Sequence, residues 1–208
     1  MSAGVLNSHV IDFTREQLFR LLLQLSFKKQ TGGFVLASGR QSDFYVDVRQ
    51  TALTGEGAIL IGKLFLHIIT RMNREVVGIS GLTIGADPLV MATIICGYQI
   101  GHPLVDGFLV RKEAKGHGAQ GIAAGGMRLA AGSSVAVCDD VITTGASMLR
   151  GIEGARSLSF TVPLALAVVD RGEDGGIEAI RGQGVKVIAL FTLTELDSGQ
   201  LQPFTLPR

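Results

Sequence analysis

The sequence predicts an α/β protein with a mostly parallel sheet flanked by helices. From residue 54 onward, amphipathic helical patterns alternate with short apolar runs of strand type, in the order αβαβ, long loop, βαβαβ. That alternation is typical of parallel strands joined by right-handed helical crossovers. The composition agrees, because 47% of the 208 residues are apolar and 18% are charged, which suits one sizeable core. No linker or internal repeat divides the chain.

The first predicted element is an amphipathic helix. Thr14 followed by Gln17 has the spacing of a capping box, so we expect the helix to begin there. It should end near Lys28 or Lys29, before two glycines. Its apolar face would consist of Leu18, Phe19, Leu21, Leu22 and Leu25.

Residues 34–48 predict a β-hairpin, in which two extended runs flank residues 38–42. Apolar and polar side chains alternate after the turn, as in a strand with one buried face. This N-terminal section does not alternate strands and helices as the rest does. We therefore expect residues 1–51 to form a small hood on a core of residues 52–208.

The core elements follow in chain order. We expect helices at 54–73, 87–98, 146–158 and 173–181, strands at 76–80, 105–110, 161–169 and 185–191, and another strand from residue 135 to the acidic pair that follows it. Segment 111–126 lacks apolar periodicity and is rich in glycine, which predicts a long functional loop.

Val135–Ser147 carries the clearest chemical pattern. An apolar run ends in Asp139 and Asp140, and a segment with three hydroxyl residues and a glycine then leads into a helix. Ligands of open α/β sheets bind at such strand ends, and N–H groups at a helix N-terminus suit a phosphate. Ionised carboxylates only accept hydrogen bonds, so the pair favours ligand hydroxyls or a metal. A phosphorylated sugar such as ribose 5-phosphate meets both demands.

Other interpretations of this stretch are weaker. A P-loop would need Gly-Lys-Ser or Gly-Lys-Thr, and a dinucleotide fold would need Gly-x-Gly-x-x-Gly after its first strand, and neither is present. The acidic pair alone would fit a solvated strand end. The Thr-Thr-Gly-Ala-Ser sequence that follows it favours the phosphate loop.

The beginning of the long loop is basic. Its first seven positions hold Arg111, Lys112, Lys115 and His117. The one acid among them, Glu113, leaves most of this charge unpaired, which favours an anion-binding role over a solvated surface turn. No second metal ligand stands at helical or hairpin spacing from His117, so we expect no metal site there.

These motifs resemble a known family. Val135–Ser147 is similar to the phosphoribosyl pyrophosphate (PRPP) motif of type I phosphoribosyltransferases, and residues 111–118 resemble the mobile catalytic loop of orotate phosphoribosyltransferases. The hairpin from Ser38 to Asp47 and the pair Asp170-Arg171 also match that family, in the right order. The resemblance covers nearly the whole chain and implies the type I phosphoribosyltransferase fold.

The resemblance also implies roles for individual residues. PRPP would be bound by Arg111, Lys112, Lys115, His117, Asp139, Asp140, Val141, Ile142, Thr143, Thr144, Gly145, Ala146 and Ser147. The acidic pair would hold the ribose hydroxyls, and the loop after it the 5-phosphate. Lys112, Lys115 and His117 would be catalytic, acting on the pyrophosphate, and Thr143 and Arg171 would contact orotate. Mg²⁺, held mainly by PRPP and not directly by protein ligands, would assist. The loop would close over the neighbouring subunit's active site, which makes the working unit a homodimer.

The position of Arg171 in the sequence also supports a role in orotate binding. It follows an apolar strand, so it should emerge at the sheet edge near the phosphate loop, where a guanidinium could bind a carboxylate such as that of orotate. The alternative is a structural Asp170–Arg171 pair. The chain departs from many family members at Ala37 and Gly85, where those members have substrate-binding lysines, and Arg40 could replace the first.

Bulk properties narrow the remaining possibilities. A formal net charge of +1 gives no global case for nucleic-acid binding. Cys96 and Cys138 lie in apolar runs, which predicts buried free thiols. No signal-peptide pattern and no uncharged stretch near the ~20 residues of a membrane span is present, so we expect a cytoplasmic protein without membrane partners.

The sequence therefore predicts an orotate phosphoribosyltransferase of pyrimidine (UMP) biosynthesis. Two alternatives stay open: a phosphoribosyltransferase for another base, such as a purine, and a regulator of the same fold that senses PRPP without turnover. The basic loop argues against the regulator, because a sensor has no leaving group to stabilise.

Overall fold

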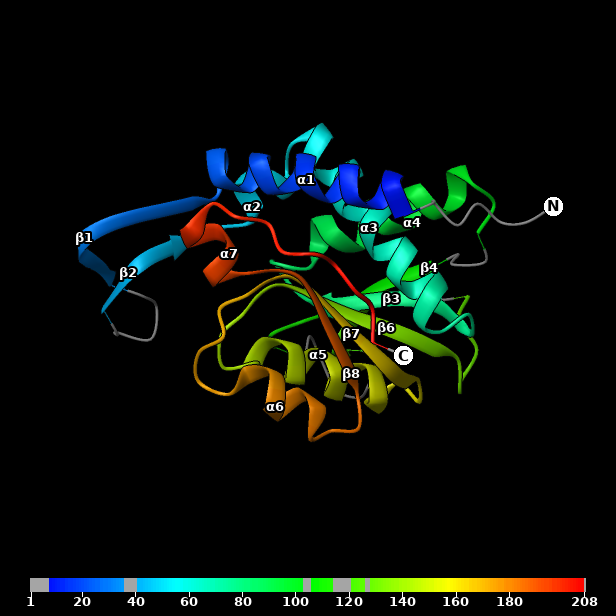
Figure 1. Ribbon diagram of the computed structural model, residues 1–208. Helices are drawn as coiled ribbons and strands as arrows, with labels where there is room; N and C mark the ends of the chain where they lie inside the picture. Colours follow the sequence, from blue (N-terminus) through cyan, green and yellow to red (C-terminus); the bar gives the residue numbers. More distant parts are fainter. Residues whose placement is uncertain (1–7, 36–40, 103–105, 114–120, 126–127, 208) are drawn as a thin grey trace.

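The protein is built on a six-stranded sheet (Figure 1). The structure is a computed structural model, and it describes residues 8–35, 41–102, 106–113, 121–125 and 128–207. The strand order is β5-β4-β3-β6-β7-β8. The strands are β3 (Val76–Leu82), β4 (Asp106–Val110), β5 (Ala123–Gly125), β6 (Ser134–Ile142), β7 (Thr161–Asp170) and β8 (Lys186–Thr192). All neighbours pair in parallel except β4 and β5, so the predicted mostly parallel sheet is confirmed. The antiparallel edge strand β5 lies in a stretch that the sequence predicted as loop.

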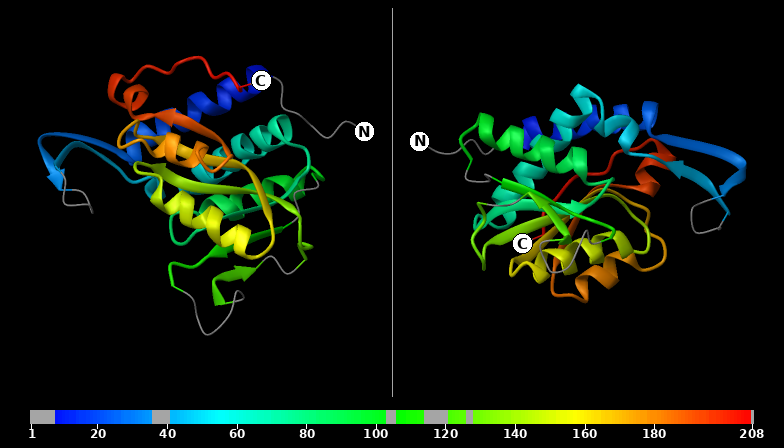
Figure 2. Two further views of the ribbon diagram at one scale, coloured as in Figure 1. Left: turned by 90° about the horizontal axis from the view of Figure 1, so that it is seen from below. Right: turned by 180° about the vertical axis from the view of Figure 1, so that it is seen from behind.

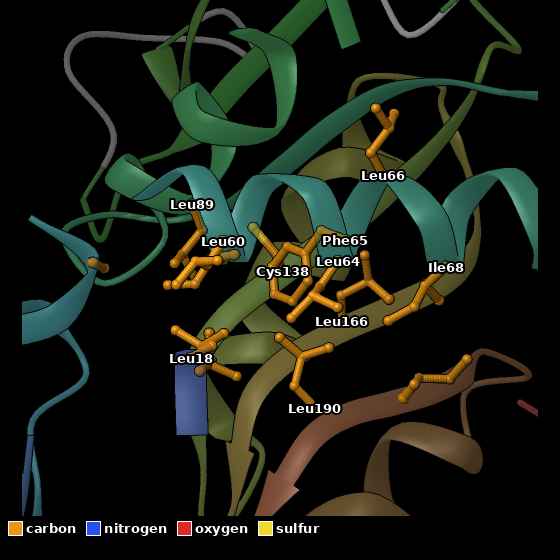
Figure 3. Close-up of a cluster of buried hydrophobic side chains, with 14 of the residues drawn as sticks. Leu18, Leu60, Leu64, Phe65, Leu66, Ile68, Leu89, Cys138, Leu166 and Leu190 are labelled. Carbon is orange, nitrogen blue, oxygen red and sulfur yellow. The ribbon is translucent and has the colours of Figure 1, made fainter. Parts of the chain in front are cut away.

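Helices cover both faces of this sheet (Figures 1 and 2). One face carries α1 (Ser8–Leu25), α3 (Gly55–Met72) and α4 (Asp87–Gln99), and the other carries α5 (Ala146–Ser157) and α6 (Gly176–Arg181). Figure 3 shows the core under α3, where Leu64 and Phe65 pack toward Cys138 and Leu166 of the sheet. The helix predicted at residues 54–73 is present as α3, and Thr54, just before it, caps it by accepting a hydrogen bond from the N–H of Gly57.

The strand order reverses between β3 and β6. The chain moves outward in one direction from β3 to β4, and in the other from β6 through β7 to β8. The helices that follow β3 and β6, α4 and α5, therefore leave on opposite faces. This reversal leaves the carboxyl ends of β3 and β6 uncovered between the two helices, which is where doubly wound sheets bind ligands.

The N-terminal section differs in detail from the prediction. The first helix begins at Ser8 rather than Thr14, whose hydroxyl donates to the carbonyl of Val10 inside the helix (2.7 Å), so the predicted capping box is wrong. The helix ends at Leu25, before the predicted lysines, because the chain enters β1 at Phe27.

The predicted hairpin is present as two antiparallel strands. These are β1 (Phe27–Val35) and β2 (Gln41–Val46), and they extend away from the body of the molecule (Figure 1). Leu18 and Leu22 of α1 belong to the same buried cluster as α3 and the sheet. The division into a hood of residues 1–51 and a core of residues 52–208 stays a prediction. Two short helices, α2 (Arg49–Ala52) and α7 (Leu193–Ser198), were not predicted.

Both cysteines are buried free thiols, as expected. No helix in the described part of the chain is long and apolar enough to cross a membrane.

A buried arginine ties α1 to the far edge of the sheet. Arg15 donates to the carbonyls of Leu190 and Gln202 and to the carboxylate of Glu195, at 2.9, 2.6 and 2.7 Å. Its guanidinium also lies over the rings of Phe191 and Phe204, within 5.0 Å of each centroid. Every part of this cation therefore has a partner, as a charge removed from water requires.

We predict that Arg15→Ala lowers the free energy of unfolding by about 3–5 kcal/mol, because it leaves Glu195 buried without its cation. Urea unfolding measures this loss. The matched control is Arg20→Ala on the same helix. The Arg20 side chain is 76% exposed and pairs with Glu16, whereas that of Arg15 is 5% exposed, so the control should cost less than about 1 kcal/mol. Equal losses in the two variants would contradict this role for Arg15.

Candidate active site

The acidic pair lies at the end of the central strand β6. Asp139 is buried and Asp140 is partly exposed. Asp139 Oδ1 accepts from the N–H of Asp140 (3.0 Å), and Asp140 Oδ1 accepts from the N–H of Val141 (2.9 Å). The strand continues through the pair to Ile142, because residues 141 and 142 still pair with β7. The strand was expected to stop at the acidic pair, and it ends two residues later, at Ile142.

The surroundings of Asp139 act on its protonation. Burial raises the pKa of Asp139 well above its usual range, the charge of Asp140 raises it further, and the ammonium of Lys112 acts in the opposite direction. A ligand that donates hydroxyl hydrogens to this carboxylate would favour its ionised form. The pair thus favours a hydroxyl-bearing ligand over a second anion.

The loop after β6 turns directly into α5. Gly145 has φ +76°, a left-handed conformation that favours glycine, and a Cβ there would lie 2.9 Å from the carbonyl oxygen of Gly176. The loop is therefore closely backed by the start of α6. Its other side is open, because Thr144, Ala146 and Ser147 are exposed. The N–H groups at the start of α5 and the hydroxyls of Thr144 and Ser147 lie together at this loop, and anion binding by them stays a prediction.

The turn after β3 meets the acidic pair across the strand reversal. A Cβ on Gly85 would lie 2.8 Å from Oδ1 of Asp140, so the glycine backbone touches this carboxylate. Gly85 and the acidic pair are therefore neighbours at the carboxyl edge of the sheet. The glycine that replaces a lysine of many family members is thus in contact with the candidate site.

Arg171 lies beside the phosphate loop. Its N–H donates to the carbonyl of Ile142 (2.9 Å), which places it next to Thr143. Its guanidinium is buried and donates to the carboxylate of Glu173 at 3.2 Å and to the hydroxyl of Ser42 at 3.0 Å. The hairpin therefore reaches the sheet edge through Ser42. The partner of Arg171 is Glu173 rather than Asp170, which accepts from the N–H of Gly172 instead.

The basic segment is described only in part. Arg111 joins the two ends of the segment, because its N–H donates to the carbonyl of Ile122 (2.7 Å) and its Nη1 to that of Gly121 (3.1 Å). Lys112 is exposed, and its charge acts on Asp139. Lys115 and His117 lie outside the described residues, as do Ala37 and Arg40 of the hairpin.

Three further residues approach this site that the sequence did not single out. Glu173 binds Arg171, Arg150 of α5 donates to the carbonyl of Lys112, and Arg49 lies near enough to Asp140 for the two charges to interact. The hydrogen bond to Asp47 raises the pKa of Arg49, and the charge of Asp140 adds to the effect. Two of these contacts had a local signal, because Asp47 and Arg49, and likewise Arg171 and Glu173, are an acid and a base two residues apart. The contact of Arg150 with Lys112 and the approach of Arg49 to Asp140 join distant segments.

Comparisons with known proteins identify the family. An orotate phosphoribosyltransferase of Sorangium cellulosum is 40% identical over 178 residues, which is 86% of this chain and 90% of the relative. The Mycobacterium tuberculosis orotate phosphoribosyltransferase crystallised with Fe(III) dicitrate is 33% identical, with a TM-score of 0.75 over 88% of this chain and 98% of that one. A structure of the same enzyme with PRPP is 29% identical, with a TM-score of 0.71 over 88% and 99%. No protein-family model matches the chain.

A parallel sheet with an acidic pair and a hydroxyl-bearing loop at its strand reversal defines a type I phosphoribosyltransferase. Within this class, identity of 40% over most of the chain narrows the assignment. The chain belongs to the orotate phosphoribosyltransferase family.

We predict that Gly145→Ala destabilises the protein more than Gly184→Ala. Both glycines have positive φ, which costs alanine about 1–2 kcal/mol, but no atom lies within 4 Å of a Cβ at Gly184. The contact with Gly176 should add at least about 1 kcal/mol at Gly145. Urea unfolding of both variants gives the difference. Equal costs would show that the loop is not held against α6.

Proposed function

We propose that this protein transfers the ribose 5-phosphate group of PRPP to orotate, giving orotidine 5′-monophosphate and pyrophosphate in pyrimidine (UMP) biosynthesis. The observation that carries the proposal is the acidic pair of β6 followed by the loop into α5, at the strand reversal of a chain in this family. We further propose that the protein works in the cytoplasm, without nucleic-acid or membrane partners.

The expected position of PRPP follows from the two ends of this loop. Asp139 and Asp140 would accept hydrogen bonds from the ribose hydroxyls, which suits their acceptor-only chemistry. The loop from Thr143 to Ser147 would bind the 5-phosphate through N–H groups and hydroxyls at the start of α5. The open side of the loop, where Thr144 and Ser147 are exposed, supports this orientation.

The leaving pyrophosphate gains negative charge as C1 of the ribose becomes cation-like. We assign its stabilisation to Arg111, Lys112, Lys115 and His117, because fixed cations act strongly where water is excluded. Mg²⁺ commonly binds through substrate phosphates, a few waters and nearby carboxylates. Asp139 and Asp140 offer carboxylates that such an ion could approach, and when bound it would neutralise phosphate charge. We therefore propose that Mg²⁺ is held mainly by PRPP.

Orotate would lie on the Arg171 side of the loop. The Arg171 guanidinium and Thr143 are neighbours at the sheet edge, which suits a carboxylate-bearing base. N1 of orotate would attack C1 of PRPP as the bond to pyrophosphate breaks. No side chain needs to act as a nucleophile, so the protein contributes positioning and charge stabilisation.

We propose a homodimer with shared active sites as the working unit. Helix α4 is apolar around its whole circumference, although only one side of it packs against α3 and the sheet. Its other side exposes Met91, Ile95 and Tyr98, and Ile84 is exposed just before it. A helix that is apolar all round is normally covered. Gly85, which touches Asp140, follows Ile84, so a partner on this face would lie beside the candidate site.

Purified protein mixed with PRPP, Mg²⁺ and orotate should consume orotate, which is followed by its absorbance, and release pyrophosphate. Arg171→Ala should lower the rate with orotate strongly, because the carboxylate loses its guanidinium partner. Turnover with a purine base and none with orotate would replace the proposed substrate. Binding of PRPP without turnover of any base would indicate a sensor and contradict the proposed activity.

The shared site predicts complementation. Lys112 acts on Asp139 of its own chain, so the partner's contribution is tested at Lys115. Homodimers of Lys115→Ala and of Arg171→Ala should each be nearly inactive. An equal mixture with free subunit exchange should recover about a quarter of the wild-type activity, because half of the dimers then carry one intact site. Absence of recovery, with exchange verified by mass spectrometry, would contradict the shared site.

A further inference from the structure

Arg150 connects the phosphate-binding helix to the basic segment. It lies in the second turn of α5, and its Nη2 donates a hydrogen bond to the backbone carbonyl of Lys112. The two residues are 38 positions apart in the sequence. One helix therefore begins at the candidate phosphate loop and, a turn later, holds the start of the segment proposed to bind the pyrophosphate.

The start of this segment is fixed from several directions. Val110 and Ala123 pair as the last residues of the β4–β5 ladder before the segment opens. Beyond them, Arg111 joins the two ends through its bonds to Gly121 and Ile122. These contacts lie within the β4–β5 unit. Arg150 adds a contact from outside that unit and so sets where Lys112 lies relative to the sheet.

The helix that carries Arg150 lies close against the sheet. A Cβ on Gly154 would lie 2.5 Å from Cγ1 of Val110, and one on Gly151 would lie 2.9 Å from Cγ1 of Val137. The glycines at these positions let the α5 backbone approach β4 and β6 directly. The backbone of Arg150, next to Gly151, therefore lies close to the sheet, although its side chain is exposed.

The contact has an electrostatic consequence. The charge of Lys112 acts on Asp139 and offsets part of the effect of burial on that carboxylate. We propose that Arg150 is a positioning residue that acts through Lys112, holding its main chain so that its ammonium faces the acidic pair and the departing pyrophosphate. This inference rests on the proposed function. It adds to that function a direct contact, the Arg150–Lys112 hydrogen bond, between the helix of the 5-phosphate site and the segment of the leaving-group site.

The first test compares Arg150→Ala with Arg156→Ala. Arg156 is a matched control, because it is an exposed arginine of the same helix and donates to a backbone carbonyl, that of Gln183, at 2.9 Å. Loss of the Lys112 contact should lower kcat roughly 10- to 100-fold, since small misplacements of a catalytic group have effects of this size. The dissociation constant of PRPP should change less than about threefold. The control should retain wild-type kcat within about twofold.

The second test is a double-mutant cycle with Lys112→Ala. If Arg150 acts through the Lys112 ammonium, Arg150→Ala should slow the wild-type enzyme but add little to Lys112→Ala alone. A general structural role would instead slow both backgrounds by the same factor. Arg150→Lys should recover part of the lost rate, because an ammonium can still donate to the Lys112 carbonyl. Urea unfolding of each variant confirms that it is folded.

The possible outcomes separate the inference from the function on which it rests. A wild-type protein without activity on PRPP and orotate would refute the proposed function. An active wild type with equal effects of Arg150→Ala and Arg156→Ala would refute only the role of Arg150. If the PRPP dissociation constant rose by the same factor as kcat/KM fell, Arg150 would bind PRPP itself and the positioning role would be refuted. Additive effects in the double-mutant cycle would also overturn the proposal.

Discussion

The candidate site depends on the reversal of strand order between β3 and β6. Because the following helices, α4 and α5, leave on opposite faces, the ends of these two central strands are not covered by either. Backbone and carboxylate then meet directly where Gly85 touches Asp140. Of the acidic pair at this point, Asp139 is buried and Asp140 stays partly exposed. A sheet wound in one direction only would have no such reversal, which is where ligands of doubly wound sheets bind.

The sequence predicted the parts of this arrangement that are encoded locally. The acidic pair and the loop that follows it consist of neighbouring residues with a known physical pattern. The Thr14 prediction failed because a capping-box spacing also occurs by chance inside a helix, where the hydroxyl turns back to a carbonyl. A true capping box at Thr192 and Glu195, which begins α7, has the same signal and was overlooked.

Side-chain contacts between distant segments could not be predicted in the same way. Arg171 was expected at the sheet edge because it follows a strand, but nothing in the sequence showed that Ser42, 129 residues away, would meet it. The same holds for Arg150 and Lys112. Such pairs depend on the final packing of helices and hairpin, which periodicity does not specify. They are also the contacts that determine where each functional group points.

The cations of the site are held in two different ways, and the difference fits the proposed chemistry. Arg171 is oriented by a carboxylate, Glu173, which cancels much of its charge. Orotate keeps its carboxylate charge throughout the reaction, so geometry matters more there than net charge. Arg150 instead holds Lys112 through a neutral carbonyl, which gathers two positive charges without cancelling either. An excess of positive charge is useful only where negative charge develops in the transition state, and that place is the departing pyrophosphate.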